Sequence, residues 1–222
     1  MTKTIEDLFV YIAISTGLIP VLLFLRFFAK AKHYIALGLI VAYCIIEFTT
    51  NIISFHISPK TFVQVYSIFT ILEYFCFTAC IYSLIRSSLF KKIIIALSLG
   101  FLIFAIFYFA YSKHKSLDSI PIGVETILIL FTSFYFLYEQ VQDLSTDLIY
   151  NRFAFWIASG IMIYLAGSFF IYIFANQVDT ETLNQYWILT NVFTTIKNLC
   201  FTISFLVFNS SYKKHRISLF SL

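Results

Sequence analysis

The chain has 222 residues, of which 60% are hydrophobic and only 12% are charged, and its mean hydropathy is +0.90. A soluble domain of this length needs far more polar surface, so this composition excludes a single water-soluble core. The net charge of +4 is small. It follows from the distribution of basic residues across a membrane and gives no reason to expect a nucleic-acid partner.

Seven apolar stretches are long enough to cross a bilayer. A helix rises 1.5 Å per residue, so about 30 Å of hydrocarbon requires roughly 20 residues. Barrel strands would alternate polar and apolar residues, and these stretches do not. The predicted spans are 8–28, 34–55, 62–85, 93–111, 122–138, 153–174 and 185–208. The sequence therefore predicts one all-α, seven-helix polytopic membrane domain over residues 1–222, with the lipid bilayer as its surroundings.

Lysine and arginine are distributed unequally between the two sides of such a bundle. If the N-terminus is outside, ten lie on the inner side and four on the outer side, with Lys197 within the membrane. This bias predicts an N-out/C-in protein of the cell inner (cytoplasmic) membrane, and a cytoplasm-dependent reporter fused after Leu222 would test it. The inner set is Arg26, Lys30, Lys32, Arg86, Lys91, Lys92, Arg152, Lys213, Lys214 and Arg216, and the outer set is Lys3, Lys60, Lys113 and Lys115.

The first three spans introduce the polar interior. Pro20 predicts a kink in the first span, which neighbouring helices make tolerable. The second span carries a polar stripe about 120° wide that includes Glu47 and Asn51, and such a stripe cannot face lipid. Helical rise places Glu47 roughly 12 Å below the outer end of its span and Glu73, in the third span, roughly 16 Å below, close to the midplane.

The next three spans carry fewer polar residues. Residues 93–111 contain no charged side chain, which predicts a peripheral or linking helix. The fifth span follows Pro121 and begins with Glu125, which we place at the outer rim of the site. In the sixth span, Gly160 and Gly167 are seven residues apart, a spacing typical of a face that another helix approaches closely.

The seventh span contains Lys197 on a polar arc that also carries Asn191 and Thr194. An ionised residue at the centre of a span costs about 2.5–3.5 kcal/mol on insertion scales, so Lys197 requires a partner. We predict Glu73 as this partner and Glu47 as the alternative. A static pair that only fixes the register of two helices is the structural alternative to a functional role.

An apparent internal duplication favours this pairing. The segment 69–78 matches 193–202 at five of ten positions, with Glu73 opposite Lys197, and residues 35–38 match 157–160 more weakly. Two parallel three-helix repeats around a linker helix, a 3+1+3 arrangement, would place a binding site at the repeat interface near the midplane.

These features predict a polar cavity open to the outer side that binds a small ligand, an ion or a proton. The candidate site residues are Glu47, Asn51, Glu73, Glu125, Asn191, Thr194 and Lys197. A transporter of a small solute, coupled to protons, is the alternative to a receptor. No cluster of catalytic side chains is present in the sequence, so we expect no enzymatic activity.

The sequence lacks the residues that usually bind metals or cofactors. The four histidines are scattered at helix ends and in loops, so no zinc site of the seven-helix ceramidase type is expected. A lysine in the last span and a carboxylate in the third resemble the Schiff base and counterion of retinal proteins, but Phe193 occupies the position of the aspartate in the microbial Asp-x-x-x-Lys motif. We therefore predict no cofactor and keep a retinal protein as a minor alternative. The histidines are His33, His56, His114 and His215.

Four short motifs resemble bacterial seven-helix membrane sensor modules, which occur alone or joined to histidine kinases. They are Glu47 in the second span, Ile71-Leu72-Glu73-Tyr74 in the third, Asn151-Arg152-Phe153-x-Phe155-Trp156-Ile157-x-x-Gly160 at the start of the sixth, and Ile196-Lys197-Asn198 in the seventh. The resemblance implies a sensory or receptor-like module. Its signal would pass through a cytoplasmic signalling protein or the basic segment Tyr212 to Arg216.

Overall fold

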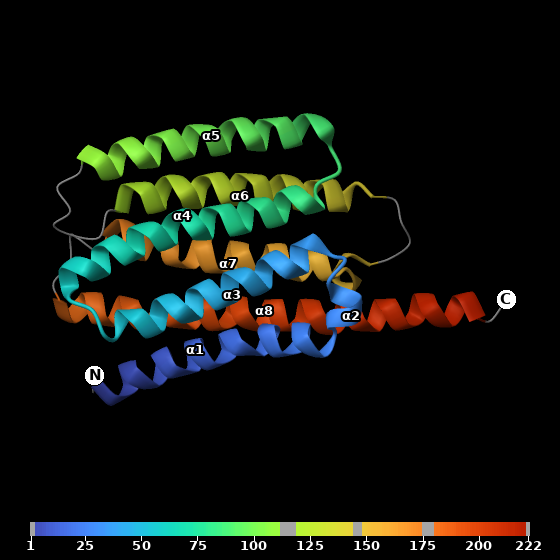
Figure 1. The fold of residues 1–222 in the computed structure, drawn as a ribbon, viewed down its shortest axis with the longest axis horizontal. Helices are drawn as coiled ribbons and strands as arrows, with labels where there is room; N and C mark the ends of the chain where they lie inside the picture. Colours follow the sequence, from blue (N-terminus) through green and yellow to red (C-terminus); the bar gives the residue numbers. More distant parts are fainter. Residues whose placement is uncertain (1–2, 112–118, 144–147, 175–179, 221–222) are drawn as a thin grey trace.

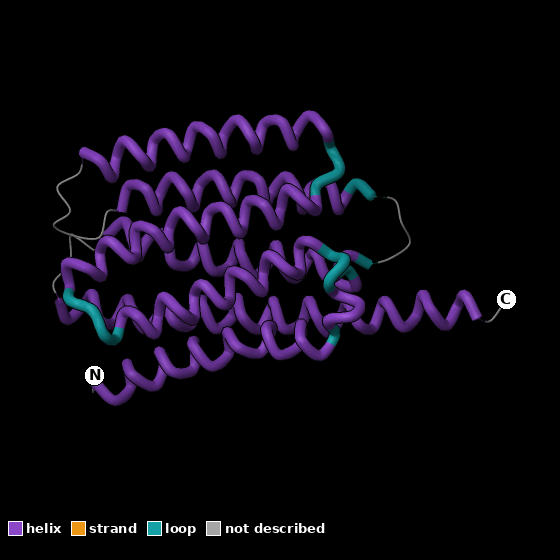
Figure 2. Tube along the Cα trace, in the orientation of Figure 1, coloured by secondary structure: helices purple, strands orange, loops and turns teal. Residues whose placement is uncertain are grey.

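The computed structural model of this protein describes residues 3–111, 119–143, 148–174 and 180–220. Within these ranges the chain forms helices and no strand (Figure 2). A short helix, α2, and a 3₁₀ turn, η1, connect longer helices. The elements are α1 (Lys3–Arg26), α2 (Phe28–Ala31), α3 (Ile35–Ser54), α4 (Pro59–Leu84), α5 (Ser88–Tyr111), α6 (Ser119–Val141), η1 (Ile149–Asn151), α7 (Phe153–Phe174) and α8 (Thr180–Phe220).

The predicted all-α, seven-helix class is confirmed. Seven of these helices are long and apolar enough to cross a membrane, and each overlaps one of the predicted spans. The two chain ends lie at opposite ends of the bundle (Figure 1). The last helix differs from its prediction, because α8 continues unbroken to Phe220 and leaves the bundle, whereas the predicted span ended at residue 208. Hydropathy marks the part of a helix that lies in hydrocarbon but does not mark where the helix ends.

Six of the long helices form a closed ring. Going around it, α1 packs on α3, α3 on α4, α4 on α6, α6 on α7, α7 on α8, and α8 returns to α1. The remaining helix, α5, packs outside the ring against α4 and α6 and lies at one edge of the bundle (Figure 1). This is the peripheral place predicted for the uncharged fourth span. The order around the ring is compatible with two sets of three helices, and the duplication itself stays a prediction.

The distribution of polarity is the reverse of that in a soluble protein. Leu22 and Leu25 of α1 and Phe107 of α5 are more than half exposed on the outside, whereas Glu73 and Lys197 are buried inside. An outer surface of this kind is stable in contact with lipid, and intramembrane ionisable groups normally face the bundle interior. The structure therefore describes an integral membrane protein of the multi-pass type.

A network of polar contacts joins two connections at the end of the bundle from which α8 projects. Glu139 of α6 accepts hydrogen bonds from the backbone N–H groups of Arg86 and Ser87, at 2.8 and 2.9 Å, and so caps the start of α5. Asp143 lies 2.9 Å from both Arg86 and Arg152. The hydrogen bond from Arg152, with the nearby Arg86 guanidinium, holds the pKa of Asp143 below its usual value.

Basic residues gather at this same end. The segments that carry Arg26, Lys30 and Lys32, the α4–α5 turn and η1 all lie at the end of the bundle from which α8 projects (Figure 1). Lys113 and Lys115, assigned to the opposite side, lie outside the described residues. The N-out/C-in orientation remains a prediction, because no membrane fixes the two sides.

Gly160 and Gly167 of α7 face α8, as their spacing predicts. A Cβ atom at residue 160 would lie 2.8 Å from Cys200 Cβ and 3.2 Å from the Lys197 carbonyl oxygen, and one at residue 167 would lie 2.5 Å from the Phe193 ring. These two glycines allow α7 and α8 to pack closely. This contact also holds the turn of α8 that carries Lys197.

We expect Gly160→Ala to lower the melting temperature of the detergent-solubilised protein by several degrees. The added methyl group would meet the Cys200 Cβ atom and the Lys197 carbonyl oxygen of α8, and such overpacking typically costs about 1–3 kcal/mol. Gly100→Ala on α5 is the matched control, because no atom lies within 4 Å of a Cβ atom there. A temperature shift in Gly160→Ala no larger than in this control would mean that the α7–α8 contact adapts freely.

Candidate functional site

Lys197 lies at the centre of the ring and is fully buried. Its Nζ atom donates hydrogen bonds to Glu47 Oε1 and to the Tyr43 hydroxyl, each at 2.6 Å. The same atom lies 4.5 Å from the centre of the Tyr43 ring and 4.2 Å from that of Tyr164. A buried ammonium group is stable only with such compensation, here one carboxylate, one hydroxyl and two aromatic faces.

Tyr43 extends this network to Glu73. Its hydroxyl accepts a hydrogen bond from Lys197 and donates one to Glu73 Oε1 at 2.8 Å. The Tyr164 hydroxyl also lies within hydrogen-bonding range of Glu73. The buried network therefore contains two carboxyl groups, two phenols and one ammonium group, contributed by α3, α4, α7 and α8.

The prediction of a direct Glu73–Lys197 pair is wrong, and the alternative partner, Glu47, forms the ion pair. The reason is the order of helices in the ring, since α4 is separated from α8 by α3 and α1 on one side and by α6 and α7 on the other. The Tyr43 hydroxyl lies between Glu73 and Lys197 and hydrogen-bonds to both. Glu73 and Lys197 are thus linked through one hydroxyl group.

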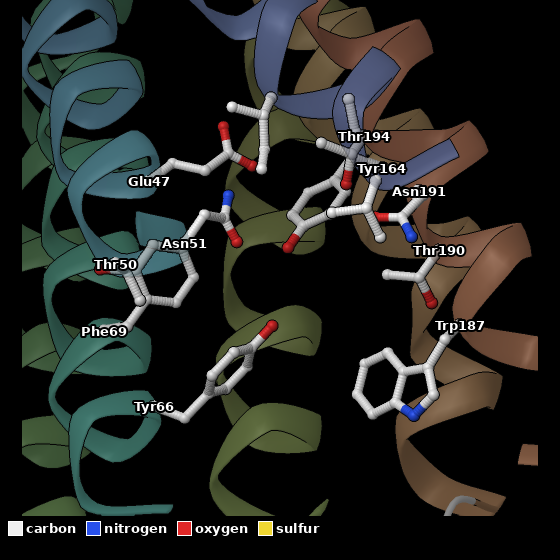
Figure 3. Close-up of a pocket in the computed structure, with 13 residues that line it drawn as sticks. Glu47, Thr50, Asn51, Tyr66, Phe69, Tyr164, Trp187, Thr190, Asn191 and Thr194 are labelled. Carbon is white, nitrogen blue, oxygen red and sulfur yellow. The ribbon is translucent and has the colours of Figure 1, made fainter. Parts of the chain in front are cut away.

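A cavity of about 70 Å³ lies next to this network, in the half of the bundle that contains the N-terminus. Residues of α1, α3, α4, α7 and α8 line it. Figure 3 shows Glu47 and Thr194 toward one end of the cavity and Tyr66 and Trp187 toward the other. The lining residues are Val10, Ala13, Ile14, Glu47, Thr50, Asn51, Tyr66, Phe69, Tyr164, Trp187, Thr190, Asn191 and Thr194.

The size and lining of the cavity limit what it can bind. A water molecule needs at least about 10–15 Å³ of such a space, so the cavity holds several waters or a solute of a few heavy atoms. Glu47 supplies a hydrogen-bond acceptor with a negative charge, and Asn51, Asn191 and the threonine hydroxyls supply neutral polar groups. The aromatic rings along the walls can face a cation.

Most of the predicted site residues come together here. Glu47, Asn51, Asn191 and Thr194 line the cavity, and Lys197 and Glu73 belong to the network behind Glu47. The structure brings these six side chains together from three helices. That they bind a ligand stays a prediction.

Glu125 does not line the cavity but lies buried on α6, where it interacts electrostatically with Glu73, which corrects its assignment to the outer rim. It is 1% exposed and lies on α6, a helix that contributes nothing to the cavity lining. Its Oε1 atom has no hydrogen-bond partner among the described residues. Its sequence position gives a depth near the outer surface, but rotation about the α6 axis buries the side chain within the bundle.

Three aromatic residues contribute more than the sequence indicated. Tyr43 belonged to the predicted polar stripe, but its bridging role did not follow from that. Tyr164 was not predicted, although it lies four residues after Gly160 and three before Gly167 and thus on the same face of α7. Trp187 lies at the edge of its span, as an interfacial residue would, and in addition lines the cavity.

Asn198, next to Lys197, attaches the same turn of α8 to α1. Its Nδ2 atom donates to the Ala13 carbonyl oxygen at 3.1 Å and lies 3.3 Å from the Thr16 hydroxyl. These atoms lie one to two turns before Pro20, which is accommodated inside an unbroken α1. Lys197 therefore connects this turn of α8 to α3, and Asn198 connects it to α1. A movement of the turn would change the contacts with both helices.

Among the described residues, no group of three or more His, Cys, Asp and Glu side chains is arranged to hold a metal ion. The chemistry that the site offers is hydrogen bonding, charge compensation and proton exchange. Comparisons with protein families, with curated proteins and with solved structures find no match to this chain.

Proposed function

We propose that this protein is a receptor-like membrane module that binds a small ligand from the outer side and passes a signal to a separate cytoplasmic protein. The observation that carries this proposal is the continuity of α8. This one helix supplies Trp187, Thr190, Asn191 and Thr194 to the cavity, carries Lys197, and projects from the opposite end of the bundle (Figure 1). At 1.5 Å per residue its 41 residues extend roughly 60 Å.

The ion pair provides the coupling. A ligand that donates hydrogen bonds to Glu47 competes with Lys197 for the same carboxylate, which weakens the attachment of α8 to α3. A shift of α8 along or about its axis then reaches the far end, because a continuous helix transmits rigid-body motion. There Lys30 contacts α8 through Asn209, at 3.2 Å, and through the Tyr212 ring.

The ligand class follows from the cavity. A small protonated amine fits best, because it donates hydrogen bonds to Glu47 and places its charge against the aromatic walls. The volume of about 70 Å³ favours a compact amine over a chromophore of the size of retinal.

The test uses the protein in lipid nanodiscs with methylamine, ethanolamine and glycine as probes, and with betaine, which has no N–H group to donate, as the control. In a Trp156→Phe background, Trp187 is the remaining tryptophan and reports on the cavity. We expect one of the amines to change its emission and Glu47→Gln to weaken that effect at least tenfold. Spin labels at Ser210 on α8 and Lys92 on α5 should change their separation over the same concentration range. Failure of every probe would contradict the ligand class, and binding without a change in separation would contradict signalling through α8.

A proton-coupled transporter is the second candidate, favoured by the chain of exchangeable protons from Lys197 through Tyr43 to Glu73. A measurement of amine or proton flux distinguishes a transporter from a receptor. Purified protein in liposomes that accumulates an amine, or that acidifies the lumen when one is added, would favour transport over sensing.

A further inference from the structure

A second cavity lies between α4 and α5, outside the ring and on the side of α4 that faces away from the polar site. It is an open groove of about 310 Å³, within the range of small-molecule pockets and about twice the volume of an enclosed apolar cavity that binds benzene. Its wall is almost entirely apolar. The lining residues are Phe75, Thr78, Ala79, Tyr82, Ile94, Ile95, Ser98, Leu99 and Leu102.

Two contacts close the ends of this groove. At one end Tyr74 of α4 hydrogen-bonds to Ser98 of α5 at 3.0 Å, and its ring packs on Phe101 at 4.2 Å between centres. At the other end the Lys91 ammonium group lies 5.2 Å from the Tyr82 ring. Between these contacts the two helices leave a groove that runs from Phe75 to Tyr82, roughly 10 Å by helical rise.

The base of the groove carries one hydroxyl group without a hydrogen-bond partner. Thr78 is 5% exposed, and its Oγ1 atom has no partner within hydrogen-bond distance among the described residues; the neighbouring Tyr74 phenol interacts with it electrostatically but is hydrogen-bonded to Ser98. A threonine in a helix normally donates to a carbonyl four residues earlier, as Thr70 does to Tyr66. A buried hydroxyl in this state is unfavourable, and a hydrogen-bond acceptor in the groove would relieve it.

The groove opens toward hydrocarbon, so its occupant comes from the bilayer. The exposed residues at its mouth, Phe75, Ile95 and Leu99, all lie within membrane-spanning segments. Thr78 is six residues from Leu84, hence roughly 9 Å inside the end of α4. Phospholipid ester groups lie at the membrane surface, and an acyl chain offers no acceptor at that depth. A lipid tail would therefore fill the groove but leave Thr78 unsatisfied.

We propose that this groove is a second binding site, for an apolar, membrane-dissolved molecule with a carbonyl group flanked by hydrocarbon on both sides. The carbonyl oxygen accepts a hydrogen bond from Thr78, and the apolar parts pack on Ile94, Leu99 and Leu102. This ligand differs from the small polar solute of the outer cavity, and its site shares no residue with that cavity.

The probe is 4-hexylbenzophenone, an apolar ketone that inserts into nearby C–H bonds under near-ultraviolet light. Protein in phosphatidylcholine nanodiscs is labelled over a range of probe concentrations, and the modified peptides are mapped by mass spectrometry. We expect labelling to saturate and to concentrate on residues 75–82 and 94–102. 4-Hexylbiphenyl lacks the carbonyl group and serves as a competitor of the probe. It should bind the groove at least fivefold more weakly than 4-hexylbenzophenone does, which is the ratio expected for one neutral hydrogen bond.

Two substitutions test separately the contribution of the Thr78 hydroxyl group and that of the volume of the groove. Thr78→Val keeps the shape of the side chain and should weaken saturable labelling about fivefold. Ala79→Leu fills the groove and should abolish it, whereas Ala96→Leu, on the exposed face of α5, should not change it. Labelling spread over all lipid-facing helices, or unchanged by Thr78→Val and equally blocked by the hydrocarbon, would overturn the proposal in favour of an ordinary lipid tail.

Discussion

Replacing Lys197 by methionine is expected to lower the melting temperature of the detergent-solubilised protein by on the order of 10 °C. The substitution leaves Glu47 without its 2.6 Å partner in a buried position. Removing one partner of a buried ion pair typically costs about 3–5 kcal/mol, and in a chain of this length each kcal/mol corresponds to about 2–4 °C. Thermal unfolding followed by circular dichroism or by thiol accessibility of the buried cysteines would measure the change.

A double-mutant cycle identifies the partner. Glu47→Gln alone should be as harmful as Lys197→Met, and the double variant should recover part of the loss because no uncompensated charge remains. Lys92→Met, at an exposed position of α5, is the matched control for loss of a lysine and should leave the melting temperature unchanged. Additive losses in the Glu47/Lys197 cycle would contradict the ion pair.

Tyr43→Phe is expected to lower the melting temperature by about 5 °C. The ring would keep its packing, 4.3 Å between centres from Phe77, but the hydroxyl group that serves both Lys197 and Glu73 would be lost. Leaving a buried polar group unsatisfied costs about 1–3 kcal/mol. Tyr34→Phe, at an exposed position, is the control and should change nothing.

The same substitution tests how Glu73 and Lys197 communicate. In the wild-type background, Glu73→Gln and Lys197→Met should show a coupling energy in a double-mutant cycle, because one hydroxyl group joins them. In a Tyr43→Phe background this coupling should decrease to the level of a distant pair. Undiminished coupling there would mean that Glu73 and Lys197 interact by a route other than Tyr43.

The cycles also separate a functional ion pair from a purely structural one. If Lys197→Met/Glu47→Gln is stable but α8 no longer shifts at an amine concentration high enough to occupy the weakened site, the pair belongs to the signalling mechanism. If α8 still shifts at that concentration, the pair serves only to hold α3 against α8. Both outcomes are measurable with the spin labels at Ser210 and Lys92.

The sequence by itself determined the class and most of the polar interior. Residues that must avoid lipid are recognisable from their helical positions, so the pattern within each span places Glu47, Asn51, Asn191, Thr194 and Lys197 on inward faces. Helical rise gives their depths, and the seven-residue spacing of Gly160 and Gly167 indicates the face of α7 on which α8 packs. These quantities depend on a single helix, so a single sequence is enough to derive them.

The tertiary structure decided which inward residues meet. Depth and apparent repeat symmetry favoured Glu73 as the partner of Lys197, but depth is a property of one helix and the repeat only relates two segments of sequence, so neither says which helices are neighbours. Ring order separates α4 from α8, so Glu47 takes the ion pair and Tyr43 reaches Glu73. The rotation of α6 similarly buries Glu125 away from the cavity. Neighbour order and rotation result from packing between helices across the whole bundle, which the pattern within any one span does not encode.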